Sequence, residues 1–376
     1  MAGATNLIVI KKITLPLLLP GLLSVLVLSL TQAFRAFEVP LLLGMPGKIE
    51  LLTTLIFLDI KQSMIGTSFG KQSAYGMLTC VMLGLSLLGY SYFTRVSSRF
   101  YTVTGKGYKP TVMRLGKGRI ITALLVMVVT LLQFAPLAVL LIASFSTSVS
   151  TFGTVFTLTN YKTAFRDPNL IESLMNSLIV GVGSALSVVI ITFLVAWIIV
   201  RTKIRFRWVL DELGSMPLSI PGVVLGLGLL QFYLWLPVPI YGTLSALALA
   251  YTTIYLPIGL RFMLPALLQI HHELEESGYM CGASLSQVMR KILLPLLLPT
   301  FLGTWIYVFL LSFRELSVSA LLYTPTTQVV ATVMLDLWNN GNLVKVSTFG
   351  TIVGLFSAFL AFSVKRWLTY NQTLAD

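Results

Sequence analysis

The chain has 376 residues, of which 56% are hydrophobic and 10% are charged, with a formal net charge of +13 and a mean hydropathy of +0.89. Soluble globular proteins carry about 25% charged residues, so this composition excludes that class and indicates a membrane protein. In a membrane protein, a positive net charge is explained first by basic residues that set the orientation of the spans, and not by nucleic-acid binding. The two cysteines provide no disulfide framework.

Eight stretches are apolar over the roughly 20 residues that a membrane-spanning helix needs. This pattern predicts an all-α integral membrane protein with about eight transmembrane helices. The predicted spans are Leu15–Phe34, Gly76–Thr94, Ile120–Ser144, Ser173–Val200, Pro217–Leu236, Thr243–Met263, Leu296–Phe313 and Ser347–Val364.

Basic residues gather in the loops on one side of such an eight-span chain. Residues 95–119, between the second and third spans, have no acidic residue and these basic ones: Arg95, Arg99, Lys106, Lys109, Arg114, Lys117 and Arg119. Basic residues also flank the first, fourth and eighth spans on that side. Because cytoplasmic loops carry the excess of Lys and Arg, we expect these loops in the cytoplasm. Contact with anionic lipid explains the 95–119 linker better than nucleic acid does.

The polar loop Glu275–Pro295 has the pattern of two short helices separated by a break at Gly282. The first helix is predicted over Glu276–Met280, and the second over Leu285–Ile292, ending at Pro295. Glycine permits a sharp turn because it has no Cβ, and proline stops or kinks the helix that precedes it.

The spacing of this loop resembles the EAA loop of ABC-transporter permeases: a glutamate, two small residues, three more residues, a glycine, nine more residues and I-x-L-P. The matching residues are Glu276, Gly282, Ile292, Leu294 and Pro295, with Ser277 and Gly278 in place of two alanines. The resemblance implies that the loop, whose region we place at 264–295, docks on an ATPase subunit. Glu276 would make a polar contact there, and the Ile292–Pro295 end would hold the loop against the bundle. The alternative is an ordinary cytoplasmic loop.

The N-terminal region repeats the later loop at an offset of 279 residues, and the run LPLLLP occurs in both copies. Matched pairs are Gly3 with Gly282, Ile13 with Ile292, Leu15 with Leu294, Pro16 with Pro295, Phe34 with Phe313 and Arg35 with Arg314. This is a duplication, and it predicts two permease halves related by a pseudo-twofold axis along the membrane normal.

Met1 corresponds to Met280, so we expect the first copy to lack about four helices relative to the family. A mis-assigned start, a disrupted gene and a true short form all fit this pattern. The predicted domains are a partial first half over 1–94, a basic cytoplasmic linker over 95–119 and a complete six-helix second half over 120–376. With the resemblance, this implies a type-I importer permease fold.

The stretches FEVPLLLGMPG (Phe37–Gly47) and TVTGKGYKP (Thr102–Pro110) resemble the fused-type ferric-iron permeases. The resemblance implies a multi-pass subunit of the bacterial inner membrane that moves iron(III) delivered by a periplasmic binding protein. Separate ATPase subunits, expected as a dimer, would drive it, and the chain has no G-x-x-x-x-G-K-[ST] loop of its own. No enzyme activity and no cofactor are expected. Permeases for thiamine, sulfate, molybdate, polyamines or phosphonates share the loop, so these substrates stay open.

Two arginines and two glutamates follow the outer ends of the matched spans and are candidates for a gate or a binding-protein contact: Arg35, Glu38, Arg314 and Glu315. The alternative is that their side chains extend to the membrane interface. Asn176 and Gln231 are polar positions in apolar spans, where a substrate pathway or a bond between helices is expected.

We expect no metal site in this chain. The adjacent His271 and His272 point in different directions on a helix. Carboxylates suit ferric iron, but in this class metal binding belongs to the partner protein, so interface or solvated roles are favoured for Glu38, Asp59 and Asp336.

Two further classes of function remain open from the sequence. A secondary transporter would need no ATPase and would carry polar clusters at mid-membrane, of which the chain offers few. A non-transporting remnant would show no uptake even when all partner subunits are present.

Overall fold

The structure, a computed structural model, describes residues 12, 15–63, 69–98, 118–148 and 155–373, and its regular elements there are all helical. This confirms the predicted all-α class for the described part of the chain. The chain divides into two compact units, with boundaries at residues 96/97, 171/172, 332/333 and 367/368, each inside a helix. Unit 1 contains Met1–Val96, Glu172–Thr332 and Leu368–Asp376, and unit 2 contains Ser97–Ile171 and Val333–Trp367.

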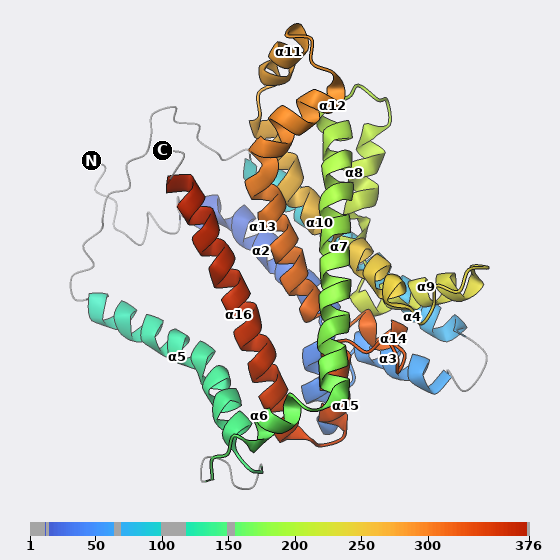
Figure 1. Ribbon diagram of the computed structural model, residues 1–376, viewed down its shortest axis with the longest axis vertical. Helices are drawn as coiled ribbons and strands as arrows, with labels where there is room; N and C mark the ends of the chain where they lie inside the picture. The colour runs from blue at the N-terminus through green and yellow to red at the C-terminus, as the bar shows by residue number, and fades with distance from the viewer. Residues whose placement is uncertain (1–11, 13–14, 64–68, 99–117, 149–154, 374–376) are drawn as a thin grey trace. The chain divides into compact units, whose positions relative to one another are not determined.

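Unit 1 holds most of the helices (Figure 1). They are α2 (Leu15–Arg35), α3 (Leu52–Ser63), α4 (Gly70–Ser98), α7 (Pro168–Arg201), α8 (Arg207–Ser215), α9 (Gly222–Trp235), α10 (Leu244–Gln269), α11 (Glu273–Met280), α12 (Leu285–Val288), α13 (Leu294–Phe313) and α14 (Ser319–Leu322). Single helical turns complete the unit at η2 (Pro40–Gly44), η3 (Met45–Gly47), η4 (Met216–Ser219) and η5 (Met289–Leu293). Most of unit 2 consists of α5 (Gly118–Phe145), α6 (Thr159–Ala164), α15 (Val330–Asn339) and α16 (Leu343–Thr373).

In the described part of the chain, five helices are long and apolar enough to cross a membrane, and up to seven spans result if each of two bent helix pairs counts as one. The five are Gly118–Phe145, Pro168–Arg201, Leu244–Gln269, Leu285–Phe313 and Leu343–Ser363. The predicted span Gly76–Thr94 lies within α4, which is not counted among them. The count of eight therefore stays a prediction.

The predicted span Pro217–Leu236 differs from a straight helix, because α8 with its last turn meets α9 at an angle of 111°. Ile220 and Pro221 are extended, with ψ of 125° and 143°, and they separate the two helices. A residue that precedes a proline is disfavoured in the helical region, so the sequence I-P-G interrupts the helix although its composition is uniformly apolar.

The core of unit 1 forms where α7, α10 and α13 pack together. Gly259 on α10 allows the close approach to α7, because a Cβ there would lie 2.6 Å from Val188 Cγ1 and 2.7 Å from Thr192 Cγ2. Small residues permit such approach between membrane helices. Nearer the α11 end, buried side chains of the same three helices and of η5 join in one cluster: Val189, Ala196, Met263, Leu267, Leu293 and Leu297.

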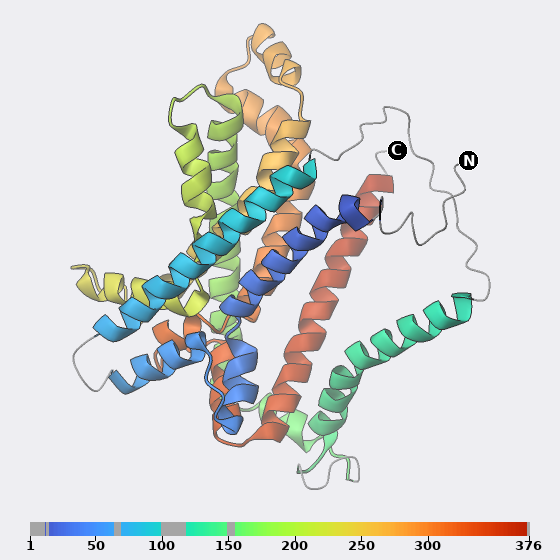
Figure 2. The same ribbon diagram turned by 180° about the vertical axis from the view of Figure 1, so that it is seen from behind.

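The helices of the first sequence copy pack on the same unit. Figure 2 shows α2, α3 and α4 on one side of it. The Thr53 hydroxyl donates to the Ala36 carbonyl at 2.7 Å, which joins α3 to the end of α2. Gly76 on α4 lies against Val224 on α9, with a Cβ position 2.9 Å from Val224 Cγ1. Residues from both copies of the repeat therefore share one compact unit.

In unit 2, hydrogen bonds to carbonyls at the end of α5 join this helix to α6 and α16. The Asn160 side chain donates to the carbonyls of Ser144 and Ser146, at 3.0 and 2.8 Å. Thr348 on α16 donates to the same Ser144 carbonyl at 3.3 Å. The predicted 95–119 linker lies mostly outside the described residues, and the predicted domain boundaries stay predictions.

We expect Gly259→Ala to destabilise unit 1 by about 1–3 kcal/mol, because the added methyl group overpacks the α7–α10 contact. The measurement is the midpoint of thermal unfolding of the purified chain in detergent. Gly183→Ala on α7 is the matched control, because its Cβ would meet nothing within 4 Å. Equal midpoints for the two variants would contradict the close approach.

Candidate functional site

The loop between α11 and α12 lies at one end of α10 and α13 (Figure 1). α11 ends in a turn in which Gly282 has φ of +81°. The Gly282 N–H donates to the Tyr279 carbonyl at 2.9 Å, and the Ala283 N–H donates to the Gly278 carbonyl at 3.1 Å. This pair of bonds is the Schellman ending of a helix, which needs a left-handed residue and so favours glycine. The predicted break at Gly282 is present.

The second helix of the loop starts at a capping box. The Ser284 hydroxyl accepts from the Gln287 N–H at 3.4 Å, and the Gln287 side chain accepts from the Ser284 N–H at 2.8 Å. The predicted stop at Pro295 is wrong, because Leu285–Phe313 continues as one long helix. A π-helical turn over Met289–Leu293 precedes the proline. The wider turn accommodates a residue that has no N–H and whose ring crowds the preceding carbonyl.

The residues of the motif pack on one another across the turn. A Cβ at Gly278 would lie 2.9 Å from Ile292 Cδ1 and 3.2 Å from Val288 Cγ2. Gly278 therefore lets α11 approach Ile292 more closely than alanine would. The small residue and the isoleucine of the spacing form a single contact that fixes the angle between the two short helices.

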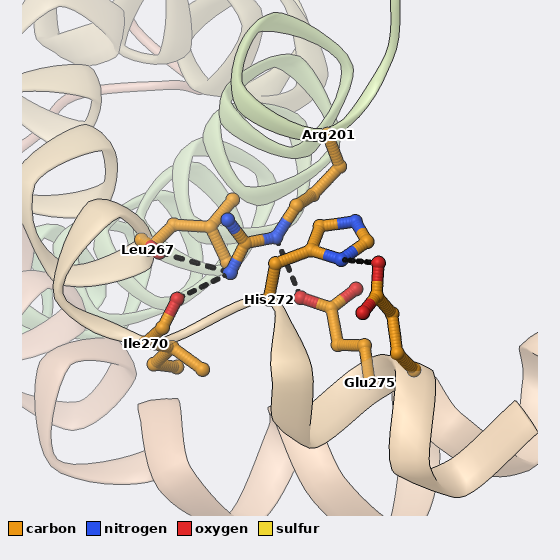
Figure 3. A network of polar contacts seen from close by, with 6 residues as sticks. Arg201, Leu267, Ile270, His272 and Glu275 are labelled. Carbon is orange, nitrogen blue, oxygen red and sulfur yellow. Dashed lines mark hydrogen bonds and ion pairs between the residues drawn. The ribbon is translucent and has the colours of Figure 1, made fainter. Parts of the chain in front are cut away.

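A buried ion pair anchors this loop to the bundle, as Figure 3 shows. Arg201 Nε, at the last residue of α7, lies 2.5 Å from Glu275 Oε1 on α11, and the two side chains are 8% and 3% exposed. Arg201 Nη2 also donates to the carbonyls of Ile270, at 2.7 Å, and Leu267, at 3.3 Å. One guanidinium thus joins the ends of α7 and α10 to the start of α11.

The two neighbouring glutamates have different environments. Glu276, which the motif singled out, is 63% exposed and lies 3.1 Å from His272 Nδ1. Glu275 is the one that faces inward, and sequence reasoning missed both it and Arg201 as a pair. The only signals in the sequence were an arginine at the end of an apolar stretch and two adjacent glutamates. These signals do not show which glutamate faces inward or that the arginine is its partner.

The outer surface of the loop is apolar. Four large apolar side chains of α11 and α12 are exposed: Leu274 at 47%, Tyr279 at 41%, Met280 at 88% and Leu285 at 48%. Exposed apolar patches of this kind mark interaction sites. Two exposed acidic residues in the first turn of α11, Glu273 and Glu276, give the neighbouring surface a negative charge.

A cavity of about 560 Å³ lies within unit 1, bounded by α2, α10 and α13. It brings together all four predicted gate residues, together with an arginine that was not predicted: Arg35, Glu38, Arg314, Glu315 and Arg261. Arg35 ends α2, Arg261 lies within α10, and Arg314 follows α13. The charged groups thus come from both copies of the repeat.

Glu315 is turned into the wall of this cavity. Its Oε2 accepts from the Tyr255 hydroxyl at 2.7 Å, and its Oε1 accepts from the Ser317 hydroxyl at 2.6 Å and from the Val318 N–H at 3.2 Å. These bonds compensate the buried carboxylate and fix the segment that follows α13. In the described part of the chain, none of the three arginines is within ion-pair distance of a carboxylate.

The other predicted polar residues join helices and do not line the cavity. Asn176 Nδ2 on α7 donates to the Gln328 carbonyl at 2.9 Å. Gln231 Nε2 on α9 donates to Ser73 Oγ on α4 at 3.2 Å. A pathway role for either stays a prediction. Of the first-copy loop residues, Gly3 and Ile13 lie outside the described residues, whereas Leu15 and Pro16 begin α2.

Asp59, considered above as a metal ligand, pairs with Lys71 at 2.9 Å. The hydrogen bond that the Lys71 ammonium group donates to Asp59 raises the pKa of Lys71. Among the described residues, no group of three His, Cys, Asp or Glu side chains is placed to hold a metal ion.

Comparison with protein families matches residues 188–372 to the binding-protein-dependent transport system inner membrane component. The chain is 26% identical over 350 residues to a ferric transport system permease protein of Actinobacillus pleuropneumoniae, an alignment covering 91% of this chain and 50% of the relative. It is 24% identical over 227 residues to a spermidine/putrescine transport system permease protein of Escherichia coli, covering 60% of this chain and 84% of the relative.

Among solved structures, the chain is similar to a bacterial ABC transporter involved in the import of the acidic polysaccharide alginate. The TM-score is 0.56 with 14% sequence identity, covering 69% of this chain and 99% of the other. This likeness shows a shared fold. The chain spans about half the length of the ferric permease relative that it matches.

We expect Arg201→Met to release the α11 loop, because it leaves Glu275 buried without its partner. Breaking one side of a buried ion pair costs about 3–5 kcal/mol, so amide hydrogen exchange across residues 271–283 should accelerate by on the order of 100-fold or more. Mass spectrometry of the purified chain measures this exchange. Lys203→Met, which removes an exposed charge two residues away, is the control. Equal exchange in both variants would show that the ion pair does not hold the loop.

Proposed function

We propose that the chain, whose residues 188–372 match the binding-protein-dependent transport system inner membrane component, is a permease subunit of an ABC importer and that iron(III) is its cargo. It is a multi-pass protein of the inner membrane. A periplasmic binding protein delivers the substrate, and a pair of separate ATPase subunits hydrolyses ATP. The chain itself binds the ATPase subunits, couples ATP hydrolysis to movement of its helices and opens a path for the substrate. It performs no covalent chemistry.

The observation that carries the proposal is the α11–α12 loop. It combines the glycine turn, the Gly278–Ile292 contact and an exposed apolar surface at one end of the long helices. A surface that includes exposed Tyr279 and Met280 has the composition of a protein interface, in which aromatic residues and methionine are enriched. We assign this surface to the ATPase, and Glu276, exposed beside it, to a polar contact at its rim.

Coupling follows from the way in which the loop is anchored. Arg201 binds Glu275 on α11 and two carbonyls at the end of α10. Movement of α11 with the ATPase therefore displaces the ends of α7 and α10 together. Closure of the ATPases would favour one of two packings of the permease halves, and release would favour the other. On this assignment the α11 loop and the 95–119 linker are cytoplasmic, in agreement with the distribution of basic residues.

Iron(III) is favoured as cargo because a ferric permease relative aligns over 91% of this chain, whereas the polyamine permease relative aligns over 60%. A phosphonate-type permease relative aligns over 62%. Phosphonate, polyamine, thiamine and sulfate-type substrates are the alternatives. Transport needs two complete halves around one path, so the assay uses the chain within its assembled transporter.

We expect Gly282→Val to weaken association with the ATPase subunit by at least about tenfold. A β-branched residue at φ of +81° costs about 1–3 kcal/mol, and the turn responds by changing the angle between α11 and α12. Co-purification from detergent with the co-expressed ATPase subunit measures association. Gly341→Val, which imposes the same strain at φ of +72° in unit 2, is the matched control. Undiminished association of the Gly282 variant would refute the docking assignment.

We expect cells that produce the assembled transporter to accumulate radioactive iron(III), and accumulation to stop when the ATPase subunit is inactivated. Excess spermidine or 2-aminoethylphosphonate should leave the rate unchanged. Uptake of either competitor in place of iron would reassign the substrate and retain the importer. Uptake that continues without an active ATPase would indicate a secondary transporter, and no uptake of any of the three would support a non-transporting remnant.

A further inference from the structure

The cavity bounded by α2, α10 and α13 concentrates positive charge inside a membrane protein. Arg35, Arg261 and Arg314 line it with Glu38 and Glu315, so three guanidinium groups and two carboxylates leave one net positive charge. Charged side chains in membrane-spanning regions are costly and mark substrate pathways when they face a cavity. The three arginines come from three separate segments of the chain. They are therefore not a group of charges at the end of a single helix.

The carboxylates do not neutralise these arginines by contact. Both oxygens of Glu315 are held by hydroxyl and backbone donors of the cavity wall, from Tyr255, Ser317 and Val318. Within the described residues, no carboxylate lies in ion-pair contact with Arg35, Arg261 or Arg314. Each guanidinium has five N–H donors and no acceptor. Unpaired forks of this kind match the oxygens of carboxylate and phosphate groups.

We propose that this cavity binds ligands that present anionic carboxylate or phosphate oxygens. The inference rests on the proposed function and specifies its substrate class: iron(III) passes as a complex that retains anionic oxygen ligands, and not as a bare cation. A bare trivalent cation or a polyamine would meet the repulsion of the three arginines. A ferric complex with net negative charge would instead receive donors from α2, α10 and the end of α13 together.

The test is equilibrium binding of radiolabelled ferric citrate to the purified full chain in nanodiscs of phosphatidylcholine. This lipid has no net charge, so no anionic headgroup competes in these discs. Arg261→Gln and Arg314→Gln should each weaken binding by about tenfold, the loss of one charge-assisted contact. Arg166→Gln, an exposed arginine of unit 2 that does not line the cavity, should bind as the unchanged chain does.

Glu38→Gln is the decisive variant, because it removes the negative charge from the cavity and should tighten ferric citrate binding several-fold. A folding defect would weaken binding instead, so the direction separates the two effects. Iron-free citrate and inorganic phosphate should compete, whereas spermidine should not bind. Repeating the measurement in phosphatidylglycerol nanodiscs identifies the source of the anion: unchanged binding supports a soluble ligand, and loss of binding means that a lipid headgroup occupies the cavity and overturns the substrate assignment.

Spermidine binding at least as tight as ferric citrate, or equal ferric citrate binding in all arginine variants, would overturn the inference. Neither result would contradict the importer assignment, because the binding experiment uses the chain without its ATPase and binding protein. Conversely, failure of the ATPase to associate would remove the importer assignment and leave the anion site measurable.

Discussion

A single guanidinium buried at the end of α7 holds the loop between α11 and α12 on the bundle. The last turn of a helix leaves carbonyl acceptors without partners inside the helix; at the end of α10 the Leu267 carbonyl accepts from the Ile270 N–H at 3.3 Å, and the Ile270 carbonyl lies within reach of Arg201. Arg201 donates to both, and its Nε–H contacts Glu275 on α11. From the last residue of α7, the same side chain therefore binds carbonyls at the end of α10 and pairs with a glutamate of α11. Since burying a charge is costly unless it is paired, these three helix ends are fixed relative to one another.

This constraint links the loop to the cavity along one helix. α10 carries the two carbonyls that bind Arg201 near its end, and Arg261 and Tyr255 further back face the cavity. Nine residues separate Arg261 from Ile270, a rise of about 14 Å along a helix. Pro257 and Pro265 lie inside α10 and remove hydrogen bonds from its ladder. A displacement applied to α11 can thus reach the cavity through a helix that is continuous but locally bendable.

Local signals in the sequence predicted the loop better than its partners. Glycine at 282 and the polar composition predicted the first short helix, the break and the start of the second helix at Leu285, because turn chemistry depends on neighbouring residues; the end of the second helix was wrong. The sequence could not show which of Glu275 and Glu276 is buried. Adjacent positions on a helix face different directions, and the inward residue is determined by Arg201, 74 residues earlier. Arg201 itself had the pattern of a topology-setting charge. Likewise, hydropathy predicted one span across Pro217–Leu236, although the extended Ile220–Pro221 pair breaks it at 111°.

The repeat gave more information about the cavity than any single residue did. Equivalence of Arg35 and Arg314 predicted that both arginines follow matched spans, and both line the same cavity. Arg261 has no counterpart in that argument, because a lone charge in an apolar helix does not reveal which neighbour it faces. One physical rule nevertheless separates the two charged sites. At the loop, the buried charge finds its partner within the chain, and its role is to hold helices. At the cavity, three arginines have no carboxylate in ion-pair contact among the described residues, and the two glutamates of the lining leave one net positive charge for solvent or a ligand to balance.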